Sequence, residues 1–540
     1  SFTNKTKETK GEDVMMKRKV VAMMMAVTLA AGMLSGCGST VKTEDGASSE
    51  STEGTTEGEG ERMTLELWTS SRDAIDNPDA WYVKKIEEEF DVNIEMKYRN
   101  EGSTDYTEWL SLALTGNDAP EWFRDQAVSQ SMLRDFVDQD LIAEIDPEMV
   151  KENMPNYMAW TEKYSNIVSD DPLHLYAIDD KVYAIPDAMP NLTQFCLMGY
   201  RQDWLDNLGL EVPKTLEEFT EVMKAFTFDD PDGNGVDDTY GYIGITGNPD
   251  WGFSPIFGAF GTCPGIWYAK EDGTVTRGEL EPGTKEALKY IKSLYDMGVI
   301  DPEWMTIDFE GAKNKMVSGT AGCSWQNWGS ILQDNGWWST VTESEPEASF
   351  AVAGGIEGEN GQIGTMQFNP LAGVGLVFTK KLENQPEKIK KYLQVFDAIS
   401  GDPAWHEAEI WGIEGETFEY DENGDRQFTE AYATEDARIK FGFGDEYRFP
   451  TLEKFQYDPE VDDAIDYSKE VNQKYADAKK VITGKYDIMG GFYLPVWSEV
   501  SAELPDMNVA FTEMITGERD IEEFDALVQE WKLSLIHISE

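Results

Sequence analysis

The sequence has few histidines and cysteines for its length. Its 540 residues include three histidines, His174, His406 and His537, and four cysteines. The histidines share no local spacing of the kind that builds a zinc site or activates a nucleophile. A Gly-x-Ser-x-Gly nucleophile elbow is absent, and so is a phosphate-binding glycine loop followed by Lys-Ser or Lys-Thr. The sequence therefore carries no recognisable catalytic motif.

Basic residues are scarce as well. Lys and Arg number 45 against 103 Asp and Glu, which gives a net charge of −58, and no basic block occurs after residue 20. A phosphate backbone or an anionic headgroup must be neutralised by clustered basic side chains, so neither nucleic acid nor a charged membrane surface is an expected partner. The hydrophobic fraction of 40% suffices for two domains of ordinary size. We interpret most of the acidic excess as solvated surface.

Long hydrophobic runs are absent except for one near the N-terminus. The run Val20–Leu34 follows a basic stretch at 17–19 and is followed by a Leu-Ser-Gly-Cys sequence that ends at Cys37. This run is too short for a comfortable transmembrane helix but suits a secretory signal. The Leu-Ser-Gly-Cys ending resembles the lipobox of bacterial lipoproteins. That resemblance implies a signal peptide at 15–36, acylation of Cys37 (as with palmitate), and an anchor on the extracellular face of the cell membrane.

The segments around the signal are excluded from the fold. Residues 1–14 are polar and precede the methionines that open the signal, so we interpret them as a non-native upstream segment. The segment 37–61 begins with the cysteine and continues almost entirely in Gly, Ser, Thr and Glu. This composition predicts a flexible tether with a reach of roughly 25–30 Å. The tail 534–540 has neither a helix cap nor a stop signal, and we give it no functional weight.

From residue 62 onward, strand and helix patterns alternate. Apolar and polar residues alternate at 63–68 and 92–98, and helical apolar stripes occur at 81–90, 104–115 and 129–139. This order predicts an α/β fold with a mainly parallel, doubly wound sheet. Ligands of such sheets bind beyond the carboxyl ends of the strands.

Aromatic and polar side chains follow two of these predicted strands. Trp68 and Arg72 lie at the end of the first strand, and Asp125 follows the short run Glu121–Arg124 that is predicted as the third strand. We therefore predict that these residues line a binding site. For Trp68, an ordinary place in the core explains the sequence equally well.

A second block begins with the segment Tyr200–Thr215. Its pattern predicts a short helix, then an N-cap at Thr215 with Glu218 three residues later, which is a capping box for the next helix. This segment resembles the signature of solute-binding family 1, the large extracellular solute-binding lipoproteins of ABC importers, which include alginate-binding and other carbohydrate-binding members. Further segments are similar to the family in the same order, at 181–186, 286–302, 316–322 and 412–415.

The resemblance implies a two-lobed, periplasmic-binding-protein-like fold of type II. Each lobe would be a mainly parallel sheet flanked by helices, with the ligand cleft between the lobes. Lobe 1 would span 62–195 with a return at roughly 370–415, and lobe 2 would span 196–369 with further helices at roughly 416–530. The implied protein is a monomer without catalytic activity. It would deliver an oligosaccharide or other carbohydrate to ABC permease subunits in the membrane.

An acidic loop follows the capped helix. With Asp230 as position 1, oxygen donors fall at the positions of an EF-hand-like loop: Asp230, Asp232, Asn234, the Val236 carbonyl and Asp238. Gly241 occupies the place of the usual bidentate Glu, so another ligand must complete the shell around Ca²⁺. The resemblance extends a structural calcium loop to this position. An acidic turn without metal is the alternative.

Aromatic residues gather where the second lobe would face the cleft. Sugar rings present apolar C–H faces and hydroxyl edges, so sugar sites combine flat aromatic rings with polar side chains. This chemistry selects as ligand-binding candidates Arg201, Trp251, Trp267, Trp325, Gln326, Asn327, Trp411 and Glu416. Each Trp taken alone is also explained by packing, whereas the set favours a glycan.

Two other functions fit the same composition. A surface-anchored, calcium-dependent glycoside hydrolase would use one of the many available carboxylate pairs, and a non-catalytic glycan adhesin would bind without transport.

The charge of the ligand is a separate question. The acidic surface disfavours an anionic glycan, although Arg72, Arg124 and Arg201 would reverse this locally.

Overall fold

The computed structural model of the chain describes residues 62–539 with several gaps. These gaps are 70, 99–104, 117, 125–127, 164–170, 188–196, 245–247, 271, 326–339, 342–344, 368–372, 448, 450–451, 453–467, 490–500 and 502–503. The expected signal, the lipid attachment at Cys37 and the tether lie outside the described residues. So do three ligand-binding candidates, Asp125, Gln326 and Asn327.

The first hydrophobic core is built on a parallel pair of strands. β1 (Met63–Thr69) pairs with β2 (Val92–Tyr98) along its whole length, so that Thr69 lies opposite Tyr98. Helix α3 (Trp81–Phe90) connects them and buries one apolar face, and Asp91 ends the helix in a left-handed conformation. The predicted strand, helix and strand of this unit are confirmed.

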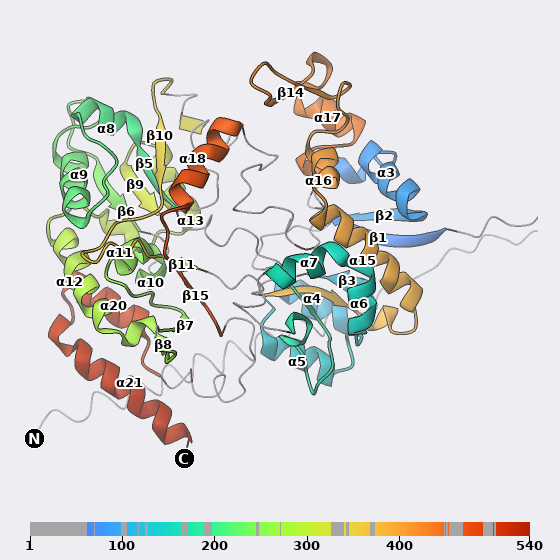
Figure 1. Cartoon of the computed structure of the whole chain (residues 1–540), viewed down its shortest axis with the longest axis horizontal. Coiled ribbons are helices and arrows are strands. Elements are labelled where there is room, and N and C mark those ends of the chain that lie inside the picture. The colour runs from blue at the N-terminus through green and yellow to red at the C-terminus, as the bar shows by residue number, and fades with distance from the viewer. Residues whose placement is uncertain are drawn as a thin grey trace, which may run out of the picture. The chain divides into compact units, whose positions relative to one another are not determined.

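A short antiparallel sheet completes the first core. β12 (Val374–Phe378) pairs with β3 (Trp122–Phe123) and with β4 (Ile185–Pro186). The chain continues from β12 into α15 (Pro386–Gly401), which packs against α6 (Pro147–Asn153) and α7 (Pro155–Lys163). Figure 1 shows this late helix beside the early elements of the chain. The first core is therefore discontinuous in sequence.

The second core surrounds a four-stranded sheet with the order β10–β5–β9–β6. Its strands are β5 (Met198–Arg201), β6 (Tyr240–Ile243), β9 (Ala321–Trp325) and β10 (Phe350–Ala353). Helix α9 (Leu216–Phe228) packs on β6, and its predicted capping box between Thr215 and Glu218 is present. Thr215 and Glu218 fix where α9 begins, and the acidic loop follows the end of this helix.

The sheets are mixed, whereas the sequence analysis predicted mainly parallel sheets. In the second sheet β6 and β9 are parallel, but β5 runs antiparallel to both β9 and β10. Parallel pairs need a crossover connection, such as the one that α3 provides between β1 and β2. Strands that enter a sheet from a distant part of the chain are free to run either way. Local alternation of strand and helix patterns does not reveal their direction.

The stretch 416–452 also differs from its expected place. Tyr447, Phe449 and Leu452 belong to the first hydrophobic core, whereas the sequence analysis expected further second-lobe helices at roughly 416–530. An apolar pattern shows that a segment is buried, but not against which of two cores. The chain rejoins the second core at α18 (Lys469–Lys479).

Shorter elements complete the described structure. The remaining helices are α2 (Arg72–Ile75), α4 (Asp105–Thr115), α5 (Gln130–Asp138), α8 (Gln202–Leu208), α10 (Pro249–Gly252), α11 (Ser254–Ala259), α12 (Pro282–Asp296), α13 (Phe309–Val317), α16 (Pro403–Ile410), α17 (Glu435–Phe441), α20 (Met507–Thr516) and α21 (Phe524–Ser539). The remaining strands are β7 (Trp267–Ala269), β8 (Val275–Arg277), β11 (Met366–Gln367), β13 (Phe418–Tyr420), β14 (Arg426–Phe428) and β15 (Lys485–Tyr486). None of the helices in the described part of the chain is both long and apolar enough to span a bilayer.

Candidate functional site

Two tryptophans meet at the carboxyl end of β1. Trp68 is only 8% exposed, and its ring lies edge-to-face against Trp109 of α4 with 5.9 Å between centroids. The buried indole N–H of Trp68 has no hydrogen-bond partner among the described residues. Trp109 is 37% exposed and presents the accessible ring of the pair. Sequence reasoning missed Trp109; its place in an amphipathic helix directly after β2 was the signal available.

A cation–π pair lies at the same edge of the sheet. Arg72, the first residue of α2, places its guanidinium carbon 4.1 Å from the centre of the Tyr98 ring. Tyr98 is the last residue of β2 and is exposed. The two parallel strands therefore end in side chains that pack on α4 and α2, at the edge where ligands of α/β sheets bind.

Arg124 is held by a buried carboxylate at the end of β3. Its Nη2 and Nε lie 2.7 and 3.0 Å from Oδ2 of Asp187, which follows β4 and is fully buried. Tyr176 lies close by. Burial raises the pKa of its hydroxyl, and the charges of Asp187 and Asp487 raise it further. The charge of Arg124 is thus balanced within the protein, and sequence reasoning missed the residue that balances it.

Arg201, another predicted ligand-binding residue, is also bound to carboxylates. Its side chain is 1% exposed, and Nη2 lies 2.6 Å from Asp203 and 2.7 Å from Glu345. Its guanidinium therefore has no surface to offer a ligand. The sequence could not show this, because Glu345 is distant along the chain.

In the second core, Trp325 supports a more accessible tryptophan. Trp325, the last residue of β9, is 1% exposed and packs edge-to-face on Trp251 with 4.9 Å between centroids. Trp251 in α10 is half-buried. Of these two predicted ligand-binding residues, Trp251 offers accessible ring surface, and Trp325 belongs to the core.

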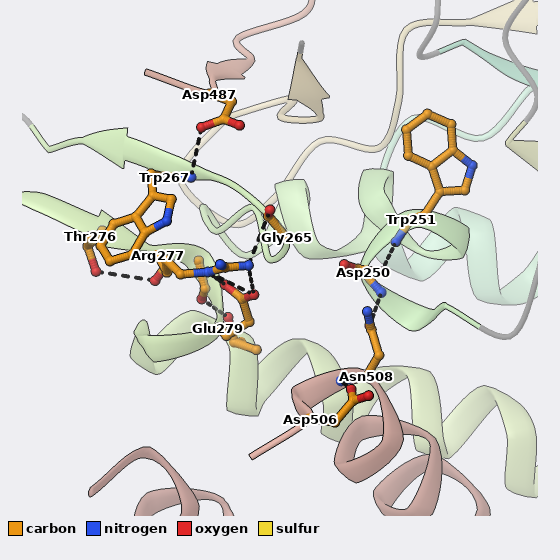
Figure 2. A network of polar contacts seen from close by, with 12 residues as sticks. Asp250, Trp251, Gly265, Trp267, Thr276, Arg277, Glu279, Asp487, Asp506 and Asn508 are labelled. Atoms are coloured by element: carbon orange, nitrogen blue, oxygen red, sulfur yellow. Dashed lines mark hydrogen bonds and ion pairs between the residues drawn. The ribbon is translucent and has the colours of Figure 1, made fainter. Parts of the chain in front are cut away.

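A polar network fixes the segments around Trp251 and Trp267, as Figure 2 shows. The carboxylate of Asp250 accepts the backbone N–H of Trp251 at 2.8 Å, and burial raises the pKa of this carboxyl. The backbone N–H of Trp267 donates to Asp487 at 3.3 Å. The Arg277 guanidinium lies 5.7 Å from the Trp267 ring centre. These contacts hold both aromatic candidates on fixed backbone.

Trp411 and Glu416 lie on the segment that packs with the first core. The half-buried Trp411 ring contacts Phe428 of β14 at 4.6 Å between centroids. Glu416 is exposed in the turn before β13, and its backbone carbonyl accepts a hydrogen bond from Thr429.

The side chains of the acidic loop converge. The amide nitrogen of Asn234 lies 2.7 Å from an Asp232 oxygen and 3.4 Å from an Asp238 oxygen, and Asp230 accepts the Gly235 N–H at 3.1 Å. Burial and the neighbouring carboxylates Asp230 and Asp238 raise the pKa of Asp232. No group of three or more His, Cys, Asp or Glu side chains in the described residues is arranged as a ready metal cluster. The loop nevertheless brings the carboxylates of Asp230, Asp232 and Asp238 together, and a cation would relieve their mutual repulsion. Carboxylate oxygens are donors that fit Ca²⁺.

The comparisons with known proteins identify the family. The bacterial extracellular solute-binding protein family matches residues 81–353, just over half of the 540 residues. Lipoprotein LipO of Bacillus subtilis is 27% identical over 402 residues, which cover 69% of this chain and 73% of LipO. FusA of Streptococcus pneumoniae, a fructooligosaccharide ABC transporter substrate-binding protein, is 27% identical over 296 residues, 52% of each chain.

Solved structures show the same fold. FusA in complex with kestose has a TM-score of 0.60 at 19% identity and covers 88% of this chain and 97% of its own. An EF-hand mutant of FusA in complex with fructo-nystose has a TM-score of 0.59 at 20% identity, with 88% and 99% covered. The two hydrophobic cores described above therefore correspond to a two-lobed solute-binding fold, and this chain belongs to the family of bacterial extracellular solute-binding proteins.

Proposed function

We propose that this protein captures a carbohydrate, an oligosaccharide above all, and delivers it to the permease subunits of an ABC importer. The observation that carries the proposal is the pairing of tryptophans at strand ends in both cores, Trp68 with Trp109 and Trp325 with Trp251. In each pair a buried ring supports a more accessible one. Flat, rigid aromatic surface suits the apolar C–H face of a sugar ring. The relationship to FusA supports the same ligand class.

In this proposal the protein binds and does not catalyse. Two lobes that close on a solute by a hinge motion keep it from water until it is delivered. The remaining ligand-binding candidates, Asp125, Gln326 and Asn327, would supply hydrogen bonds to sugar hydroxyls. Lipid attachment at Cys37 would keep the monomeric protein at the extracellular face of the cell membrane, near its permease.

The acidic loop is proposed as a structural calcium site. Side-chain oxygens of Asp230, Asp232, Asn234 and Asp238 and the Val236 carbonyl would hold the ion. Calcium would neutralise the clustered carboxylates and fix the connection between α9 and β6. The EF-hand named for FusA supports this assignment.

Thermal melting across a panel of oligosaccharides tests the function. A glycan at 100 times its dissociation constant should stabilise the folded state by about 2.7 kcal/mol, which is seen as a raised melting temperature. The glycan should be recovered intact after incubation. Accumulation of cleaved products would instead establish a glycoside hydrolase. If no glycan in the panel shifted the melting temperature, the binding proposal would fail.

A further inference from the structure

Almost all arginines in the described part of the chain are paired. With 103 acidic residues against 45 basic ones, a guanidinium readily finds a carboxylate in the folded protein. Such ion pairs hold Arg62, Arg124, Arg134, Arg201, Arg277, Arg426 and Arg519. Arg438 instead donates hydrogen bonds to the backbone carbonyls of Tyr432 and Ala433.

Arg72 is the exception among these described arginines. Its guanidinium stacks on Tyr98 and forms no ion pair or hydrogen bond with any residue in the described part of the chain. Asp73 and Asp76 follow nearby, yet neither pairs with it. Stacking holds the plane of the guanidinium while leaving the N–H donors at its edge available. The fold thus keeps one arginine ready to receive an acceptor from outside.

The place of Arg72 matches that role. It directly follows β1, and its stacking partner ends β2, so both lie at the carboxyl edge of the parallel pair. The Trp68 and Trp109 pair lies at the end of the same strand β1. Tyr98 is 36% exposed and Trp109 is 37% exposed, unlike the buried aromatic rings of the first core.

We propose that the glycan bound by this protein carries a carboxylate, as in a uronic acid oligosaccharide, and that Arg72 receives it. This rests on the proposed function in carbohydrate binding. The guanidinium fork matches a carboxylate in a bidentate pair, and such charge-assisted hydrogen bonds are stronger than neutral ones. Tyr98 positions Arg72, and Trp109 offers a ring for the sugar face.

The overall negative charge of the protein does not prevent a carboxylate from binding in direct contact with Arg72. Salt screens the field of exposed charges beyond about 8–10 Å, whereas a carboxylate in contact with Arg72 is screened much less. The net charge of −58 makes the local cation more necessary, because without it an anionic sugar would meet only repulsion.

Isothermal titration with matched acidic and neutral sugars tests the proposal. The probes are trigalacturonate and trimannuronate, their methyl esters, and the neutral trisaccharide kestose. We expect an acidic trisaccharide to bind more tightly than its ester. Arg72→Gln should weaken binding of the acid about 10-fold or more and leave binding of the ester unchanged. Arg438→Gln is the matched control, since Arg438 also stacks on an aromatic ring, 4.4 Å from the centre of Phe428, and has no carboxylate partner among the described residues.

The outcomes separate a failure of the role proposed for Arg72 from a failure of the carbohydrate-binding function. Binding of a neutral sugar without binding of either acid would overturn the role of Arg72 while leaving the carbohydrate function intact. Equal weakening by Arg72→Gln and Arg438→Gln would also overturn it, since the effect would then come from net charge alone. If none of the sugars bound to the wild-type protein, the carbohydrate function itself would be rejected. Melting temperatures of both variants establish that they are folded.

Discussion

Arginine takes two different roles in this protein, and the environment of each residue decides which. Arg201 is buried between Asp203 and Glu345, and Arg124 is bound to the buried Asp187. Their charges are compensated within the fold. Arg72 stacks on an exposed ring at a strand end and stays available to a ligand. Removing one partner of a buried pair costs several kcal/mol because the other charge is left without compensation. Substituting an exposed, unpaired arginine costs the fold little.

Asp397 is a buried acid whose ionisation should change the free energy of unfolding with pH. Its carboxylate caps α7 by accepting the backbone N–H groups of Asn156 and Tyr157 at 3.1 and 2.8 Å. These bonds favour the charged form, but burial outweighs them and raises the pKa to about 6. The folded state therefore holds this proton more tightly than the unfolded state does.

The stability contribution of Asp397 should fall as pH rises. Below the unfolded pKa of about 4 the group is protonated in both states. Between about pH 4 and 6 only the unfolded chain releases the proton, so this group's contribution to stability decreases over that window and is constant above it. We expect the difference in unfolding free energy between wild type and Asp397→Asn to be larger near pH 4 than near pH 7, as measured by urea denaturation. A difference that grows with pH would contradict the assignment.

At the scale of single elements, two loops share the same residue types but differ in electrostatics. The loop at 230–238 brings several carboxylates together, which contributes to the raised pKa of Asp232. The β13–β14 turn also contains Asp, Asn and Gly. There Asp421 accepts the backbone N–H groups of Asn423 and Asp425 at 2.8 Å, which lowers its pKa. The turn holds its carboxylate with backbone N–H groups, whereas the loop after α9 places carboxylates beside one another, which is why a cation is proposed there.

Calcium should therefore stabilise the protein through the loop at 230–238. We expect a chelator to lower the melting temperature of the wild type. Asp232→Ala should lower the melting temperature in calcium buffer and make it insensitive to the chelator. Asp421→Ala is the control, because it removes backbone hydrogen bonds and should destabilise the protein equally with and without calcium. If Asp232→Ala and wild type melted alike in both buffers, the calcium site would be refuted.

At the scale of the whole molecule, two large hydrophobic cores contain most of the buried apolar residues that the structure describes, and each is assembled from distant parts of the chain. The first contains Leu65 and Phe378, and the second contains Phe219 and Trp531. Separate cores allow separate unfolding, so a single two-state transition is not expected for this chain. A solute that contacts both lobes is released when either one unfolds, so its binding free energy opposes whichever lobe would unfold first.

Calorimetry should resolve this organisation. Without a glycan we expect two overlapping unfolding transitions, and Asp232→Ala should shift only the one that belongs to the second core. A saturating glycan should bring the two transitions together, because neither lobe then unfolds without releasing the ligand. Transitions that stayed separate under a saturating glycan would show that it binds to one lobe alone.

The sequence could predict those features of the fold that depend on residues close together in the chain. Local signals were reliable: the capping box at Thr215, the helix at 81–90 and the strand at 92–98 depend on neighbours a few residues away. The segments that resemble solute-binding family 1 gave the fold class for the same reason, since they are short and ordered along the chain. The sequence could not predict the direction of the strands or the core to which residues 416–452 belong. Both depend on packing partners far along the chain.

The sequence by itself determined the family, the class of fold and the residue types of the candidate sites. Only the tertiary structure decided which side chains are left for a ligand. In the sequence, Arg72, Arg124 and Arg201 were equally good candidates for contact with an anionic glycan. Trp68 and Trp325 could likewise not be told apart from the more accessible tryptophans. Folding paired two of the arginines with Asp187, Asp203 and Glu345 and left Arg72 unpaired among the described residues. The physical reason is that a side chain's availability depends on which distant carboxylate or ring packs against it, and packing partners are set by the fold.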